Sequence, residues 1–294
     1  MKVLKQSKNK QDKMITNEEH KNLLQTARTI RHAIIDTTMK AGGAHIGGGM
    51  SALDIMVTLY FKYLNIDPAN PDNPDRDRFV LSKGHSAIGY IPVLAERGFF
   101  DKKLLDTFNK FKSPFGMHPD SLKIAGCDAS TGSLGHGLPM SVGMAMGAKI
   151  QNKKFYTYCI VGDGELNEGS NWEAAMTAAH HKVDNLLLFV DRNMHMIDGP
   201  VEEVMSIEPL TDKWRAFGWE VLEIDGHDLN EIAKAIDTAH ATKGKPVVVI
   251  AKTVKGKGVD FMEDQTKWHY GAIDSEMGEQ AHTSIDKMYS ELGI

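Results

Sequence analysis

The chain has little cysteine and no long apolar run, and both absences narrow its class. Its two cysteines, Cys127 and Cys159, cannot build a disulfide framework, and Cys159 lies within an apolar segment where a free thiol is an ordinary core residue. Its apolar runs are short and strand-like, well below the roughly 18 residues that span a bilayer. We therefore expect a protein without a membrane segment, in a reducing compartment such as the cytoplasm.

A strong excess of charge of one sign is also missing. The formal net charge is −5 and the pI is about 6.2, which argues against nucleic acid or an anionic membrane as the main partner. Residues 1–15 are rich in Lys, Gln and Asn and lack the apolar segment of a secretory signal. We expect a flexible arm over 1–15 and a single domain over 16–294, whose core the 41% hydrophobic content can fill.

What the sequence does contain is an alternation of strand-like and helix-like segments. Five apolar runs are expected as strands: 79–81, 155–161, 185–190, 220–224 and 246–251. A capping box at 16–19 predicts the start of a long first helix, which a glycine-rich bend at 41–50 follows. Helical spacing predicts further helices at 52–63, 88–98, 102–111, 140–150, 168–182, 212–217 and 229–242, and a closing helix after 271. This order predicts an α/β fold, with a mostly parallel sheet and helices on both faces.

Polar residues follow two successive strands of this predicted sheet. Gly162-Asp163-Gly164 ends one apolar run and Asn193 follows the next, so that Asp163 and Asn193 stand 30 positions apart, about one βαβ unit. Because parallel strands joined by a helix end at the same edge of a sheet, these two side chains should share that edge. A carboxylate and an amide oxygen suit a hard cation, and the turn's backbone N–H groups near a helix start suit a diphosphate.

Four histidines also occupy positions that favour a cleft. His45, His85, His118 and His269 each lie on a loop flanked by Gly or Pro, or at the start of a helix. A single loop histidine is usually a surface residue, but four at such turns indicate a shared function. Imidazoles exchange hydrogen bonds with hydroxyls and transfer protons near neutral pH.

Taken in order, these segments resemble the amino-terminal, diphosphate-binding part of transketolases, over Thr16 to Ile273. The matching segments are Ala44-His45-Ile46-Gly47-Gly48, Ser82-Lys83-Gly84-His85, Met117-His118-Pro119, Thr131 to Gly137, Gly162-Asp163-Gly164, Asn193 and Trp268-His269-Tyr270-Gly271. The resemblance implies a thiamine-diphosphate-binding fold with thiamine diphosphate and Mg²⁺ as cofactors, Ca²⁺ being tolerated in place of Mg²⁺.

The resemblance also implies which residues hold the cofactor. Metal ligands would be the side chains of Asp163 and Asn193 and the backbone carbonyl of His195, whose imidazole is not expected to bind. Seven further residues would lie along the thiamine diphosphate: His85, Gly162, Gly164, Gly132, Ser133, Leu134 and His269. Glu168 would lie near a subunit interface. A glutamate at the start of a helix is also explained by the helix dipole alone.

The catalytic residues implied are three of the four histidines. His45 and His269 would face the substrate hydroxyls, and His118 would bind the donor sugar. By default Lys255, Lys257 and Lys267 are solvated surface residues, although the loop that carries them is placed to close over the site.

The resembled mechanism requires a glutamate on a pyrimidine-binding domain, and this chain matches neither that domain nor the carboxy-terminal one. We therefore expect one subunit of a split transketolase, which moves a two-carbon glycolaldehyde unit from a ketose phosphate to an aldose. Its partner would be a C-terminal transketolase subunit, in a heterotetramer with two copies of each chain. The alternatives are a cofactor-binding subunit of a two-oxo-acid dehydrogenase or of a deoxyxylulose-phosphate-type synthase, and a non-catalytic regulatory relative; the histidines favour ketol transfer.

Overall fold

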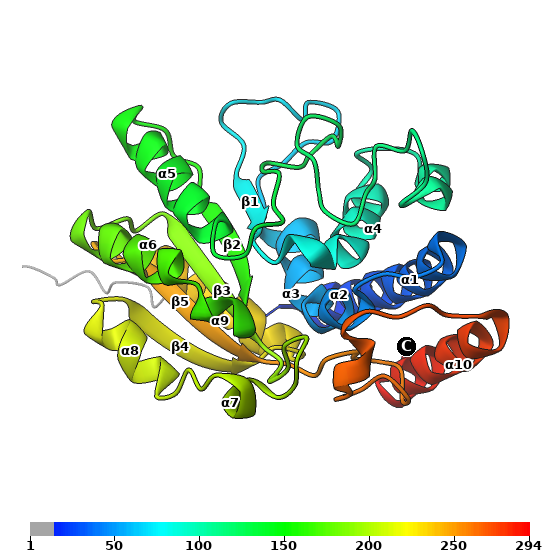
Figure 1. Cartoon of the computed structure of the whole chain (residues 1–294). Coiled ribbons are helices and arrows are strands. Elements are labelled where there is room, and N and C mark those ends of the chain that lie inside the picture. The colour runs from blue at the N-terminus through cyan, green and yellow to red at the C-terminus, as the bar shows by residue number, and fades with distance from the viewer. Residues whose placement is uncertain (1–14) are drawn as a thin grey trace, which may run out of the picture.

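A computed structural model describes residues 15–294, which form a five-stranded sheet covered by helices on both faces (Figure 1). The strand order is β1-β2-β3-β5-β4 and every neighbouring pair is parallel. The strands are β1 Arg78–Leu81, β2 Thr157–Gly162, β3 Leu186–Arg192, β4 Glu220–Asp225 and β5 Val247–Lys252. The predicted α/β class is confirmed. The predicted arm lies outside the described residues except for Ile15, which is buried.

The helices fall between the strands, as the alternation predicted. The α-helices are α1 Asn17–Ala41, α2 Ile46–Ser51, α3 Leu53–Thr58, α4 Ala87–Arg97, α5 Gly137–Ile150, α6 Gly169–His180, α7 Val201–Val204, α8 Leu210–Ala216, α9 Leu229–Ala241 and α10 Ser275–Glu291. There is also a π-helical segment, η1 Leu59–Tyr63. The 3-10 helices are η2 Gly84–Ser86, η3 Lys102–Thr107, η4 Gly164–Asn167 and η5 Thr266–His269. Within residues 15–294, no helix is both long and apolar enough to cross a bilayer.

The two faces of the sheet bury separate hydrophobic cores because side chains alternate along each strand. On β3, Leu187 and Phe189 face the core shared with α1, α3, α4, α9 and α10. Leu186, Leu188 and Val190 face the opposite core, shared with α5, α6 and α8. All seven residues of β3 are buried, which explains why the run reads as continuously apolar until its polar end.

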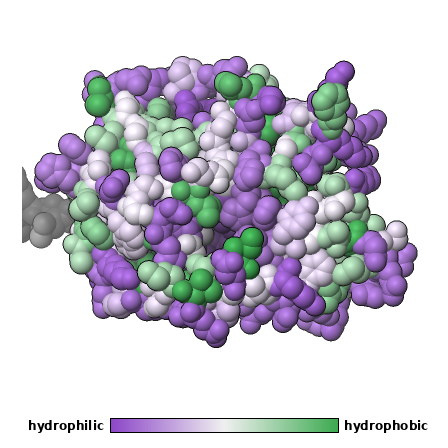
Figure 2. All heavy atoms as spheres, viewed as in Figure 1, coloured by the Kyte–Doolittle hydropathy of each residue, from purple (hydrophilic) through white to green (hydrophobic). Residues whose placement is uncertain are grey.

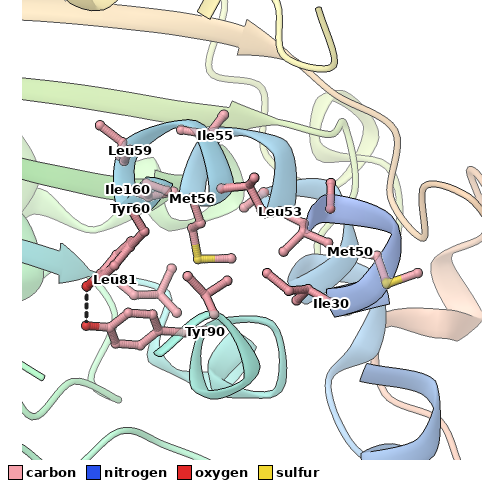
Figure 3. Packing of buried hydrophobic residues seen from close by; sticks show 14 of the residues in the cluster. Ile30, Met50, Leu53, Ile55, Met56, Leu59, Tyr60, Leu81, Tyr90 and Ile160 are labelled. Atoms are coloured by element: carbon pink, nitrogen blue, oxygen red, sulfur yellow. Dashed lines mark hydrogen bonds between the residues drawn. The ribbon is translucent and has the colours of Figure 1, made fainter. Parts of the chain in front are cut away.

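The first core packs α3 against α1, α4 and the ends of β1 and β2. Figure 3 shows Met56 of α3 and Ile30 of α1 pointing into this core, with Leu81 and Ile160 contributed by the strands. Tyr60 and Tyr90 are both buried, and their hydroxyls join in a 2.8 Å hydrogen bond that satisfies both polar groups (Figure 3). This packing holds the amino-terminal helices against the sheet edge at which β1 and β2 end.

Two local expectations were wrong. The glycine-rich bend at 41–50 contains the helix α2, whose residues are all buried and whose glycines allow backbones to approach closely. Gly49, for example, has no room for a side chain beside Gly89 of α4. The helix expected at 102–111 is the shorter 3-10 helix η3, since the left-handed backbone at Asn109 and Lys112 (φ 56° and 66°) cannot continue a helix.

A buried ion pair joins α1 to α3. The Arg31 guanidinium donates two hydrogen bonds to the Asp54 carboxylate, at 3.0 and 2.8 Å, and the two side chains are 1% and 7% exposed. The His227 imidazole lies 2.8 Å from the same carboxylate. On the same helix as Arg31, Arg28 pairs with Asp286, but these side chains are 34% and 51% exposed and so are in contact with water.

Replacement of Arg31 by Leu should lower the free energy of unfolding by about 3–5 kcal/mol, because it leaves the Asp54 carboxylate buried without its cation. The matched change Arg28→Leu should cost about 1 kcal/mol or less, since water screens an exposed pair. Urea unfolding followed by circular dichroism measures both. Equal losses in the two variants would contradict this assignment.

Candidate active site

The carboxyl ends of the strands carry the polar motifs to one edge of the sheet, where they line a pocket of about 430 Å³. Figure 2 shows a recess on this side of the molecule, with hydrophobic side chains near its rim. Most of the residues singled out from the sequence line the pocket: His45, His85, Gly132, Leu134, Gly162, Asp163, Gly164, Glu168, Asn193, His195 and His269. Ser133 and His118 are not among its lining residues and are exposed.

Asp163 and Asn193 stand side by side, as their spacing predicted. Gly162 is in register with Asp191, so β2 and β3 end at the same level. The Asp163 Oδ2 atom accepts the Met194 N–H at 2.7 Å, and the Asn193 Oδ1 atom accepts the next N–H, that of His195, at 3.2 Å. Because consecutive amides reach both oxygens, the two side chains present them to the same part of the pocket.

Asp163 is 1% exposed, and its carboxylate accepts hydrogen bonds from two backbone N–H groups. Burial, reinforced by the charge of Asp191, raises its pKa, while the Arg192 guanidinium lies 3.3 Å away. Within residues 15–294, no three histidine, cysteine or carboxylate side chains gather as a ready metal site. A cation here would therefore rely on Asp163, on an amide oxygen and on backbone oxygen.

The backbone carbonyl of His195 is the third oxygen at this place. It accepts a 3.1 Å hydrogen bond from the Lys255 ammonium. The His195 imidazole turns away, with Nδ1 2.8 Å from the Thr266 hydroxyl and Nε2 2.7 Å from the Asp264 carboxylate. Both nitrogens of this imidazole are thus engaged away from Asp163 and Asn193.

Three of the four histidines form a cluster at the pocket. The ring centroids of His45, His85 and His269 lie 5.1 to 5.5 Å apart, with His85 and His269 stacked. The Nδ1 atom of His45 is buried and has no hydrogen-bond partner within the described part of the chain. An orphaned buried nitrogen in a pocket is a position at which a bound molecule can complete a hydrogen bond.

These imidazoles are held neutral. Burial, followed by the positive charges of Lys83 and Lys255 respectively, lowers the pKa of His85 to about 2 and that of His269 to about 3. Burial also lowers the pKa of His45. Because the Lys255 ammonium donates to His269 Nδ1 at 3.0 Å, the ring proton of the neutral His269 is on Nε2, which is therefore a donor.

The fourth histidine, His118, lies against the Gly132-Ser133-Leu134 turn, of which Gly132 and Leu134 line the pocket. A side chain at Gly132 would come within 3.1 Å of the His118 ring, so glycine allows the two segments to touch. Leu134 lines the pocket as an apolar surface and Ser133 faces solvent. Glu168 lines the pocket and is exposed, at the residue that precedes α6.

Sequence reasoning missed three charged residues at the pocket. Lys255, expected as a surface residue, is 1% exposed, and burial lowers its pKa to about 8. Lys83 is 2% exposed and forms an ion pair with Asp191. Glu165 is buried, and burial raises its pKa. For Lys83 a signal existed, since it stands two residues after a buried strand and directly before Gly84-His85.

Glu165 also corrects the expectation that the Gly-Asp-Gly turn offers free N–H groups. Its carboxylate accepts the Gly162 N–H at 3.0 Å and the Gly135 N–H at 2.9 Å, and it bonds the Ser82 hydroxyl. The Gly164 N–H donates to Asp163 Oδ1 at 2.8 Å. The turn thus uses these donors to fix the loops around the pocket.

Residues 23–287 match the family model described as transketolase, thiamine diphosphate binding domain. The chain is 40% identical over 262 residues to an apulose-4-phosphate transketolase subunit from Phocaeicola vulgatus, covering 89% of this chain and 93% of that protein. It is 41% identical over 270 residues to 6-deoxy-6-sulfo-D-fructose transketolase subunit SqwG of a Clostridium species, covering 92% and 98%.

Longer relatives match over part of their length. The chain is 39% identical to human transketolase over 271 residues, which is 92% of this chain but 42% of that protein. The crystal structure of Campylobacter jejuni transketolase superimposes with a TM-score of 0.84 at 33% identity, over 90% of this chain and 43% of the other. The chain thus spans less than half the length of these two proteins.

The NMR signals of the His85 and His269 ring protons should not shift between pH 7 and pH 5, below the pKa of about 8 of the neighbouring Lys255. Over this range an ordinary imidazole, with a pKa of about 6.5, gains most of its proton. Replacement of Lys255 by Met should raise the pKa of His269, because it removes the nearest positive charge. Lys267→Met, at an exposed lysine, is the control and should leave that pKa in place. A midpoint near pH 6.5 in the unmodified chain would contradict the neutral cluster.

Proposed function

The chain belongs to the transketolase thiamine diphosphate binding domain family, and we propose that it is the cofactor-binding subunit of a split transketolase. With a second polypeptide, it transfers a two-carbon glycolaldehyde unit from a ketose phosphate to an aldose. The observation that carries this proposal is the pocket itself, which combines Asp163 and Asn193 with three neutral histidines.

Chain lengths support the split architecture. Two relatives named as transketolase subunits match over 93% and 98% of their own lengths, whereas full-length transketolases match over 42% and 43%. The partner would supply the pyrimidine-binding and carboxy-terminal domains, including the glutamate that activates the cofactor. A symmetric heterotetramer with two copies of each chain is the simplest assembly.

The residues present fit a cation that carries a diphosphate. Asp163, Asn193 and the His195 carbonyl offer three oxygens, the donor type that Mg²⁺ prefers and Ca²⁺ accepts. A divalent ion would compensate the buried Asp163 carboxylate, whose pKa burial has raised. The Lys255 ammonium, which already reaches the His195 carbonyl, adds positive charge for an anionic ligand.

Other pocket residues would position the rest of thiamine diphosphate. His85 would lie near its diphosphate, while Gly132, Ser133 and Leu134 would contact the aminopyrimidine side. Glu168, which is exposed at the pocket, would face the subunit interface. Bound thiamine diphosphate supplies the carbanion chemistry that protein side chains lack.

The histidines would orient the sugar and move protons. His269 presents an Nε2–H donor, set by its bond to Lys255, to a substrate oxygen. The Nδ1 atom of His45, which has no hydrogen-bond partner among the described residues, would exchange a proton with a substrate hydroxyl. His118, exposed beside Gly132, would contact the donor sugar from the rim.

The histidine cluster distinguishes this proposal from its rivals. A two-oxo-acid dehydrogenase subunit or a deoxyxylulose-phosphate-type synthase would need the same cation site. Three neutral imidazoles at one pocket suit a substrate with several hydroxyls. A regulatory relative without turnover has no use for a buried Asp163 beside Asn193, and calorimetry with thiamine diphosphate and Mg²⁺ tests that alternative directly.

The purified chain alone should show no ketol transfer, and activity should appear when the product of the neighbouring reading frame is added. Donor screening would compare apulose 4-phosphate, 6-deoxy-6-sulfofructose and xylulose 5-phosphate. If the purified chain alone transferred the ketol unit as fast as the two chains together, the split-enzyme proposal would be wrong. Decarboxylation of a two-oxo acid without ketol transfer would favour the first rival.

Replacement of Asp163 by Ala should weaken Mg²⁺-dependent thiamine diphosphate binding to the pair by more than about 100-fold, since even supporting residues of a metal site cost about 10- to 100-fold. Asp225→Ala is the matched control, an exposed aspartate at the end of the edge strand β4, and should change the affinity less than about twofold. Isothermal titration calorimetry measures both. Unchanged affinity in the Asp163 variant would remove this residue from the cation site.

A further inference from the structure

We propose that Asp191 is a positioning residue that fixes the orientation of the Asn193 amide, so that the amide oxygen and not its NH₂ group faces the cation. The inference rests on the proposed function, since it concerns the cation site. Asp191 is fully buried near the end of β3, in register with Gly162 of β2 and Ala251 of β5. It lies beside the pocket but is not among its lining residues.

Donors from four segments converge on the Asp191 carboxylate. Its Oδ2 atom accepts the Ser51 hydroxyl at 2.6 Å and the Asn193 Nδ2 group at 2.9 Å. The Lys83 ammonium bonds the same oxygen, and the Thr253 hydroxyl bonds Oδ1. These residues come from the end of α2, from the segments after β1 and β5, and from the end of β3 itself, so the carboxylate joins the loops around the site.

The carboxylate acts as an acceptor, because the Lys83 ammonium that forms an ion pair with it can only donate. Lys83 is held in place by a second bond, to the Gly48 carbonyl at 2.7 Å. An ionised carboxylate only accepts hydrogen bonds, so the group that faces it must be a donor.

This requirement selects one orientation of the Asn193 amide. With Nδ2 against Asp191, Oδ1 lies on the other side and accepts the His195 N–H at 3.2 Å. A flipped amide would set its oxygen against the carboxylate and its NH₂ group against that N–H, and both contacts would be repulsive. The alternation of side chains along a strand puts residues 191 and 193 on the same face, which makes the contact available.

A reciprocal exchange tests this contact in the full chain with its partner. Asn193→Asp adds a carboxylate to the cation site, which by charge alone should strengthen Mg²⁺ binding. If Asp191 positions residue 193, the new carboxylate instead faces a buried one, and Mg²⁺ affinity in the presence of thiamine diphosphate should fall by about tenfold or more. Asp191→Asn alone should weaken binding similarly.

The double variant Asp191→Asn with Asn193→Asp restores the donor and acceptor in exchanged places and keeps the net charge. We expect its Mg²⁺ affinity to exceed that of both single variants. Recovery should be partial, because Lys83 loses its ion pair with residue 191. Asp225→Asn, the same change at an exposed position, should have less than a twofold effect. Two results would overturn the proposal. One is an Asn193→Asp variant that binds Mg²⁺ as tightly as the unmodified chain or more tightly; the other is a double variant that binds Mg²⁺ more weakly than both single variants.

Urea unfolding of the cofactor-free chain gives a second readout that needs no bound metal. The double variant should unfold at a higher urea concentration than either single variant, because the two residues touch. Independent, additive effects of the two changes would also overturn the proposal. If the unmodified chain with its partner subunit bound no Mg²⁺ in the presence of thiamine diphosphate, the proposed function would be refuted. The unfolding comparison would still decide whether Asp191 orients Asn193.

Discussion

The parallel register of β1, β2, β3 and β5 is the constraint on which the site depends. Because these strands run in the same direction, the segments that follow all four emerge at one edge, although they are separated by up to about 170 positions in the chain. The pairing of Gly162 with Asp191 sets the levels of Asp163 and Asn193. A shift by one residue would turn one of these side chains to the opposite face of the sheet.

The site concentrates buried charge, and each charge acts on its neighbours. Lys83 and Lys255 help to keep the adjacent imidazoles neutral, while Lys83 keeps Asp191 ionised. Asp163 is also buried, but its pKa is raised although Arg192 pairs with it at 3.3 Å, and this distinguishes it from Asp191. Burial therefore lowers the pKa values of His85 and His269 and raises that of Asp163, because in each case it disfavours the charged form.

Much of the fold could be predicted because local patterns and tertiary packing agree. The buried run at 185–190 and the capping box at Thr16 predicted β3 and the start of α1, and the capping box is present with its reciprocal hydrogen bonds. Prediction failed where a tertiary contact overrode local preference. Glycines at 47–49, typical of a bend, lie in a helix that other segments approach too closely for a side chain, as α4 does at Gly49.

By itself the sequence determined the alternation of strands and helices, the spacing of Asp163 and Asn193, and the histidines at glycine-flanked turns. Only the tertiary structure decided that Lys255 is buried beside His269, that the Glu165 carboxylate accepts the N–H of Gly162, and that Asp191 gathers four donors. The physical reason is that burial and charge pairing join residues distant in the chain. A lysine or a carboxylate in a loop reads as solvated until the packing around it is known.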